Sequence, residues 1–265
     1  MQCPITGDPM RKIFSHTILN KYEVDYFYSE QSKIIQTEKP YWLAEAYQEA
    51  IVQSDVGLVA RNIGNRDKTA LALNLTGLAG GPKVDLGGGY GLFTRLMRDI
   101  GYDFYTTDPY CKNIFATRHE APAGLRATAL TAFEVFEHIE NPLAFVAENF
   151  EKYQCRTIIF STLNYGPEIP GLDWWYWVFH GGQHITFYNT TTLDTLAEKL
   201  GCRYYGLDSG FHIITDKSMS FPRRLALRHR WARSCYKTCT KRLNRRPGLL
   251  ESDFQKIVSH IVKQP

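Results

Sequence analysis

The sequence lacks the features that mark membrane-spanning and disulfide-stapled proteins. No apolar run reaches the roughly 18 residues that a transmembrane helix needs, and no basic segment followed by an apolar stretch opens the chain, so we expect no signal peptide. The six cysteines are scattered and form no Cys-x-x-Cys pair, which argues against a zinc knuckle and a disulfide framework. We therefore expect reduced thiols in a cytoplasmic protein.

The chain also lacks internal repeats and low-complexity tracts, and its 265 residues suit one large domain or one domain with appendages. Its positive charge is unevenly distributed. Ten of the 31 Lys and Arg residues lie between Arg223 and Arg246, a segment without acidic residues. The rest of the chain has 21 Lys and Arg and 27 Asp and Glu, so it is net acidic. This basic tail could be a solvated helical face, an attachment to an anionic membrane surface or lipid-linked acceptor, or a nucleic-acid contact. No RNA-binding module accompanies it, so we consider nucleic acid unlikely.

Aromatic residues, at 14% of the chain, concentrate in two segments, Tyr22 to Tyr28 and Trp174 to Phe187. The second belongs to a long segment from Leu163 to His184 without predicted helices or strands, and long loops in compact domains are usually functional. Two interpretations remain open. The aromatic side chains could cover a flat or sugar-like acceptor, or they could form a hydrophobic core.

The pattern of apolar residues predicts three regions: an N-terminal loop and helical cap over residues 1–80, a core over 81–216, and a basic helical extension over 217–265. In the first region, helices are expected over Tyr41–Val52 and Lys68–Leu78. In the core, predicted strands alternate with predicted helices, which indicates a parallel sheet covered on both faces. The strands are expected at Lys83–Leu86, Tyr102–Thr107, Arg126–Phe133, Arg156–Ser161, Arg203–Gly206 and Phe211–Thr215, the last two antiparallel. The helices are expected at Leu92–Ile100, after the Asn141-Pro142 start signal, and after Thr192 as N-cap.

A glycine loop joins the first core strand to its helix, in the order Val84-Asp85-Leu86-Gly87-Gly88-Gly89-Tyr90-Gly91. Glycines let the backbone approach a ligand without a Cβ clash, and the helix N-terminus offers N–H groups. Asp108 follows the next strand and can accept hydrogen bonds from ribose hydroxyls. The dinucleotide fingerprint needs a third glycine at position 92, where this chain has leucine, so a nicotinamide-dependent oxidoreductase is the weaker alternative.

A second segment sharpens this interpretation: Thr131-Ala132-Phe133-Glu134-Val135-Phe136-Glu137-His138-Ile139-Glu140-Asn141-Pro142. With the glycine loop, it resembles the class I S-adenosylmethionine-dependent methyltransferases, in particular the small-molecule branch that includes sugar- and glycan-associated enzymes. Gln183 to Tyr188 also resembles a family segment. The resemblance covers about Lys83 to Thr215. It implies an α/β, Rossmann-like fold, doubly wound around a mostly parallel sheet of seven strands, with S-adenosylmethionine as cofactor.

The resemblance also implies cofactor contacts. The methionine end would be held by the loop residues Asp85, Gly87, Gly88, Gly89, Tyr90 and Gly91. Asp108, followed by Pro109, would hold the ribose, and Glu134 would lie beside the methionine portion or the substrate. The acidic residue that many relatives use for adenine is not evident, although Glu120 is near, which favours backbone or apolar contacts to the adenine.

The acceptor is predicted to be a small molecule, with a saccharide or glycan precursor and O-methylation favoured. A hydroxyl acceptor needs a base, and His184 and His138 are the candidates because histidine titrates near neutral pH. In the alternative, each histidine packs within its loop. Glu134 is the third candidate catalytic residue, in a positioning role.

Some sugar methyltransferases begin with cysteine pairs that bind zinc. Here Cys3 is followed by Thr6 at the second position, and one thiol cannot complete a tetrahedral site, so we predict no metal. A non-catalytic binding protein that keeps the fold is the other alternative function.

Overall fold

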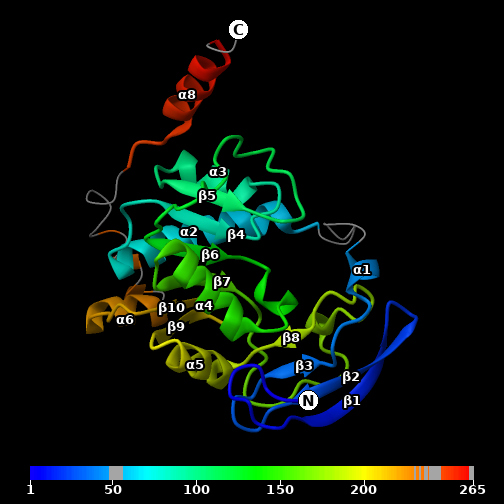
Figure 1. Cartoon of the computed structure of the whole chain (residues 1–265). Helices are drawn as coiled ribbons and strands as arrows, with labels where there is room; N and C mark the ends of the chain where they lie inside the picture. Colours follow the sequence, from blue (N-terminus) through cyan, green and yellow to red (C-terminus); the bar gives the residue numbers. More distant parts are fainter. Residues whose placement is uncertain (48–55, 230, 233, 236–237, 239–245, 263–265) are drawn as a thin grey trace. The chain divides into compact units, whose positions relative to one another are not determined.

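The computed structural model describes residues 1–47, 56–229, 231–232, 234–235, 238 and 246–262 (Figure 1). Two β-sheets are present in these residues. One has four strands in the order β1-β2-β3-β8, and the other has six in the order β5-β4-β6-β7-β10-β9. The chain divides into two compact units. Unit 1 comprises residues 1–55, 132–152 and 156–217, and unit 2 comprises residues 56–131, 153–155 and 218–265. The division at residues 80 and 216 stays a prediction.

The N-terminal part of unit 1 is an antiparallel sheet, so the predicted helical cap is wrong for this segment. Its strands are β1 (Arg11–Ile18), β2 (Tyr22–Tyr28), β3 (Ile35–Thr37) and the distant β8 (Thr186–Phe187). In β2 every second residue is buried, at Val24, Tyr26 and Tyr28. That two-residue period is the signature of a half-buried strand. Only the short helix α1 (Leu43–Ala46) matches the helix expected over Tyr41–Val52, and residues 48–52 lie outside the described part of the chain.

The two aromatic segments meet in the core of unit 1. Tyr26 and Tyr28 of β2 are buried together with Tyr176 and Trp177 of the 3₁₀-helix η2 (Trp175–Trp177). Phe187 of β8 joins the same cluster. The core interpretation of these aromatics is therefore the correct one for the buried rings, whereas Trp175 is 71% exposed.

The rest of unit 1 contains the antiparallel strands β7 (Thr157–Ser161), β10 (Phe211–Thr215) and β9 (Arg203–Asp208), as expected for the last pair. Helix α4 (Pro142–Tyr153) begins as predicted, with the Asn141 side chain accepting a hydrogen bond from the Ala144 N–H at 2.9 Å. Helix α5 (Thr190–Lys199) begins earlier than expected. Asn189 is its N-cap, and Thr192 is the third helical residue, whose hydroxyl accepts from the Asn189 N–H in a capping box.

Unit 2 contains the parallel strands β5 (Phe104–Thr107), β4 (Lys83–Leu86) and β6 (Ala129–Ala132, whose last residue falls in unit 1). Helix α3 (Leu92–Asp99) packs against β5 and against helix α2 (Leu58–Thr76), which is longer than the predicted segment Lys68–Leu78. Gly77 ends α2 in the left-handed conformation.

The core sheet is mixed and has six strands in the described residues, with antiparallel pairing at β10, so the predicted seventh strand is not confirmed. Beside β5 the described residues form a single isolated parallel bridge, between Thr106 and Glu120. Two backbone hydrogen bonds flank that bridge, from the Thr106 N–H to His119 and from the Ala121 N–H to Thr106. The chain between β5 and β6 is mostly irregular, so pairing at this edge ends after one residue.

The described residues of the C-terminal segment include the helices α6 (Phe221–Arg228) and α8 (Leu250–Val262). Much of the basic tail, including residues 239–245, lies outside the described residues. In the described part of the chain, no helix has the length and apolar character that crossing a membrane requires.

Candidate functional site

The glycine loop of unit 2 turns sharply between β4 and α3. Gly87, Gly89 and Gly91 have φ values of 63°, 54° and 83°, a region that favours glycine over residues with a Cβ. Gly91 is the N-cap residue of α3 and has no side chain to cap it. A contact between the first N–H groups of α3 and a ligand stays a prediction.

Gly88 has an ordinary φ but no room for a side chain. A Cβ at this position would clash with Thr106 Oγ1 and lie 2.7 Å from Asp85 Oδ2. Its N–H and that of Gly87 both point to the carbonyl oxygen of Thr107, at 3.3 and 2.8 Å. The loop is thus held against the end of β5 by its own backbone.

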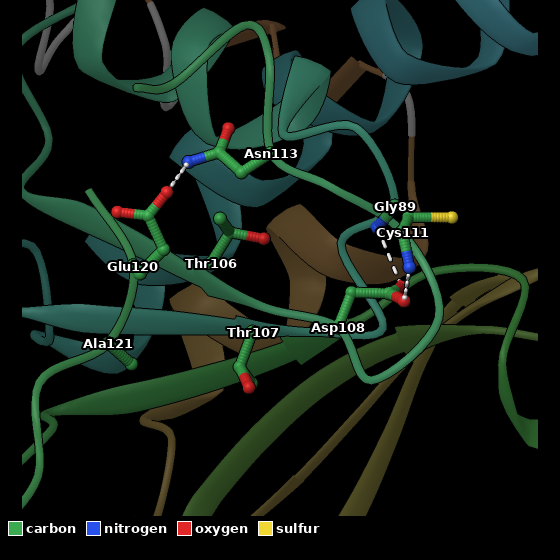
Figure 2. A pocket seen from close by; sticks show the side chains of 8 residues that line it. All are labelled: Gly89, Thr106, Thr107, Asp108, Cys111, Asn113, Glu120 and Ala121. Atoms are coloured by element: carbon green, nitrogen blue, oxygen red, sulfur yellow. Dashed lines mark hydrogen bonds between the residues drawn. The ribbon is translucent and has the colours of Figure 1, made fainter. Parts of the chain in front are cut away.

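Asp108, at the end of β5, holds the loop from the other side (Figure 2). One carboxylate oxygen accepts a hydrogen bond from the Gly89 N–H at 2.9 Å. The other accepts from the N–H groups of Tyr110 and Cys111, each at 2.8 Å. The carboxylate therefore fixes the position of the glycine loop and of the turn that follows Pro109. This is a structural function in addition to the predicted contact with ribose.

A pocket opens between these elements, lined by Gly89, Thr106, Thr107, Asp108, Cys111, Asn113, Glu120 and Ala121 (Figure 2). Asn113 donates from Nδ2 to Glu120 Oε1 at 2.8 Å and to the Ala116 carbonyl oxygen at 2.6 Å. Glu120 therefore lies on the wall of the same pocket as Asp108. From the sequence, Glu120 could be described only as near the predicted cofactor site. The structure shows that the single bridge to Thr106 brings it to the pocket.

Asp85, the acid before the turn, is almost fully buried. Thr131 on β6 donates a hydrogen bond to its Oδ1 at 2.6 Å. Burial raises the pKa of Asp85 to about 7, the Thr131 hydrogen bond opposes this, and the charge of Asp108 adds to it. A cationic ligand at the loop would favour the ionised carboxylate, which fits the predicted role toward an ammonium group.

This pKa predicts how the stability of the unliganded protein depends on pH. The folded value of about 7 lies above the ordinary value of 3.8, so ionised Asp85 destabilises the fold and protonation relieves the effect. Between pH 7 and pH 5, wild type should gain about 2 kcal/mol in unfolding free energy relative to Asp85→Asn. Urea unfolding at pH 5, 6 and 7 measures this difference, and parallel pH profiles of the two proteins would contradict the assignment.

In unit 1, Glu134 follows the end of β6 in a strained turn. Its φ of 55° is unusual for a residue with a side chain. Ser161 on β7 stabilises the turn, since its Oγ accepts from the Glu134 N–H at 2.8 Å and donates to Glu134 Oε1 at 2.6 Å. Glu134 is nevertheless exposed as a residue. The structure therefore supports a positioned carboxylate at this turn, while its contact with cofactor or substrate stays a prediction.

The two predicted histidines lie side by side in unit 1. His138 ends the 3₁₀-helix η1 (Phe136–His138), and His184 lies in the loop before β8, with ring centroids 5.1 Å apart. Each Nδ1 faces a backbone carbonyl oxygen, that of Gln183 at 2.9 Å for His138 and that of Tyr176 at 2.8 Å for His184. Burial lowers the pKa of both, for His184 to about 3 with a further contribution from His138. Both rings are therefore neutral near pH 7.

Comparison with known families decides the class of the protein. The model of a family described as a methyltransferase domain matches residues 63–206, more than half of the chain. The chain belongs to this methyltransferase family. The prediction of an enzyme that uses S-adenosylmethionine is confirmed at this level, and the oxidoreductase alternative is not supported. No curated protein matches the chain.

Among solved structures, the methyltransferase is similar to magnesium protoporphyrin IX methyltransferase of Synechocystis PCC 6803 with bound SAH, at 14% identity and a TM-score of 0.42. That match covers 65% of this chain and 90% of the other. Human N-acetylserotonin methyltransferase is similar at 14% identity and a TM-score of 0.38, and the match covers 67% of this chain and 66% of the other. The small RNA methyltransferase HEN1 is similar at 14% identity and a TM-score of 0.39, and the match covers 65% of this chain and 27% of the other. At these values the similarity carries no information on the acceptor.

Sequence reasoning missed several residues around the methyltransferase's predicted site. Thr131 was named only as part of a motif, although its side chain bonds the Asp85 carboxylate, and Thr106 and Asn113 were not considered. Glu137, also named only within the motif, is fully buried beside the two histidines. No sequence signal was available for Thr131, because it lies opposite Asp85 only through the register in which β6 pairs with β4.

Proposed function

We propose that this methyltransferase transfers the methyl group of S-adenosylmethionine to a hydroxyl oxygen of a small molecule, with a saccharide or glycan precursor as the favoured acceptor. The observation that carries the proposal is the pair of neutral histidines in unit 1. Because both Nδ1 atoms donate to backbone carbonyl oxygens, both Nε2 atoms keep a lone pair directed away from the backbone contact. Such nitrogens accept from a hydroxyl.

The chemistry is an in-line displacement at the methyl carbon, in which the sulfonium leaves as a neutral thioether. The enzyme's main task is to align donor and acceptor. A hydroxyl must also lose its proton as its oxygen attacks, which is the step that His184 and His138 serve. Glu134 acts as a positioning residue at the start of the same segment.

For the cofactor, we propose that Asp85 faces the methionine ammonium and that the loop from Gly87 to Gly91 surrounds the methionine end. The pocket of Figure 2 supports an assignment of the ribose to Asp108 and of the adenine side to Glu120. Asn113 orients the Glu120 carboxylate, which makes it a defined acceptor for an amino group.

The basic tail between Arg223 and Arg246 supports an anionic or lipid-linked acceptor, with the protein peripheral to a membrane surface. Its ten basic residues have no acidic neighbours in the sequence. An assay with free saccharides, a lipid-linked saccharide in vesicles and small RNA distinguishes these acceptors.

The function is tested with radiolabelled S-adenosylmethionine and a panel of hydroxyl acceptors. We expect an alkali-stable methyl ether as product. His184→Gln should lower kcat by roughly 100-fold or more, the usual contribution of a positioned acid–base group, with little change in cofactor Kd. His180→Gln is the matched control, since His180 is an exposed histidine of the same loop. Label on nitrogen or carbon, or full activity of His184→Gln, would contradict the proposal.

A further inference from the structure

Three side chains of unit 1 bring metal-binding atoms together. Glu137 and His138 come from η1, and His184 comes from the loop before β8, 46 residues further along the chain. One ligand atom of each lies within 4.8 Å of the others, and Glu137 is fully buried while the histidines are partly buried. Such a set of one carboxylate and two imidazoles is typical of divalent metal sites.

The backbone holds these groups in place independently of any ligand. The Ile185 N–H donates to the Glu137 carbonyl oxygen at 2.8 Å, which ties the His184 segment to η1. Thr186 Oγ1 donates to the Ile139 carbonyl oxygen at 2.7 Å, and buried Gln36 on β3 donates to the Glu140 carbonyl oxygen at 2.6 Å. Strands β3 and β8 thus hold the segments of η1 and His184 in place.

The histidine tautomers also suit a metal. Metal-bound histidines usually donate their second ring N–H to a carbonyl or carboxylate oxygen, which orients the ring. Here the Nδ1 atoms of His138 and His184 have such carbonyl partners, so Nε2 is the nitrogen that would bind the ion.

Glu137 has a comparable supporting contact. The Tyr176 hydroxyl donates to Glu137 Oε1 at 2.9 Å. The Tyr176 carbonyl oxygen in turn accepts from His184 Nδ1 at 2.8 Å, so one buried residue orients two of the three groups. A divalent cation is a favourable partner for a buried carboxylate.

We propose that Glu137, His138 and His184 bind a divalent transition-metal ion such as Zn²⁺, with an open coordination position for the acceptor hydroxyl. Three protein ligands with an open position are the arrangement of catalytic rather than structural zinc sites. The second half of the inference rests on the proposed function. A bound ion would occupy the Nε2 lone pairs of both histidines, so the ion and not a histidine base would then activate the hydroxyl. The coordinated hydroxyl would release its proton to solvent, its oxygen would bond to the methyl carbon, and the C–S electron pair would stay on the sulfur of the thioether. This inference replaces the sequence-based prediction of no metal.

The experiment is metal titration of the purified full chain after EDTA treatment, with Zn²⁺ and Co²⁺ as probes and calorimetry and the Co²⁺ absorption spectrum as readouts. Wild type should bind one ion per chain, and His184→Gln and Glu137→Gln should each weaken binding by at least about 100-fold. His180→Gln and Cys3→Ser are controls, because neither residue belongs to the cluster. Circular dichroism of each variant shows whether it is folded.

The site would be overturned if the wild type bound no stoichiometric metal ion. It would also be overturned if His184→Gln and Glu137→Gln were folded and still bound the ion as the wild type does. Because metal binding is measured without cofactor or acceptor, it is separate from the proposed activity. A bound ion together with methylation of nitrogen or carbon would overturn O-methylation and the acceptor half of the inference. Methyl ether formation that continues unchanged in EDTA would overturn the metal's part in the reaction alone.

Discussion

Replacement of Asp108 by alanine will weaken binding of S-adenosylmethionine by about 100-fold or more. The change removes the acceptor of three backbone N–H groups, those of Gly89, Tyr110 and Cys111. Each such charge-assisted bond contributes about 1.5–3 kcal/mol, and about 2.8 kcal/mol corresponds to a hundredfold change in Kd. The glycine loop then loses its anchor to the end of β5, and the proposed ribose contact disappears with it. Calorimetry with S-adenosylmethionine and S-adenosylhomocysteine measures the loss.

Asp67→Ala is the matched control, because Asp67 is a carboxylate of the same unit paired with its neighbour Arg66 at the surface. Its Kd should equal that of wild type. Asp108→Asn keeps one acceptor oxygen, but its amide NH₂ group would face the other N–H donors. We therefore expect its Kd for S-adenosylmethionine to be close to that of Asp108→Ala. Wild-type affinity in Asp108→Ala would refute the assignment of the cofactor cleft.

The second large effect concerns stability, at the contact between α8 and α3 in unit 2. The Asp253 carboxylate accepts from Arg98 Nε at 2.7 Å and from Nη2 at 2.6 Å, and both residues are buried. Arg98 also donates to Asp103 and to the Phe104 carbonyl oxygen of β5. Asp253→Ala leaves a buried guanidinium without its main partner, which typically costs about 3–5 kcal/mol. Urea unfolding followed by circular dichroism measures the change.

The same pair predicts an acid limit. Although burial opposes ionisation, the hydrogen bonds and charge of Arg98 hold the pKa of Asp253 at about 2, below the ordinary 3.8. Its contribution to stability is therefore complete above about pH 4 and is lost as the pH falls toward 2. The control Asp99→Ala removes an exposed partner of Arg95 and should cost less than about 1 kcal/mol. Equal unfolding midpoints for Asp253→Ala and Asp99→Ala would contradict the prediction.

Elements whose causes lie within a few residues were predictable from the sequence. The strand, glycine loop and helix from Lys83 to Asp99 are contiguous, and their positive φ values fall on glycines. The start of α4 at Asn141-Pro142 is equally local. The N-terminal sheet was missed, although the alternation in β2 was visible, because its aromatics were interpreted as a cluster and not as the buried face of a strand. The N-cap of α5 was misplaced by three residues, since Asn189 and Thr192 are both good capping residues and form one box.

The residues of the candidate site also fall into those that the sequence predicted and those that it did not. The acid and the glycines of the cofactor loop, and the acid that follows the next strand, could be named from spacing alone. The residues that form hydrogen bonds with these acids, or that line the same pocket, could not be named from the sequence. Thr131 meets Asp85 only because β6 pairs with β4 in one register, and Glu120 reaches the pocket through a single bridge to Thr106.

The sequence by itself determined the methyltransferase class of this protein, because glycine conformation, helix starts and the order of motifs are local properties of the chain. Only the tertiary structure decided that the loop before β8 returns to η1, where His184 joins Glu137 and His138. Contacts between residues 46 positions apart depend on packing of an entire sheet, and no local pattern records them. That packing turned two separate histidines into one candidate metal site.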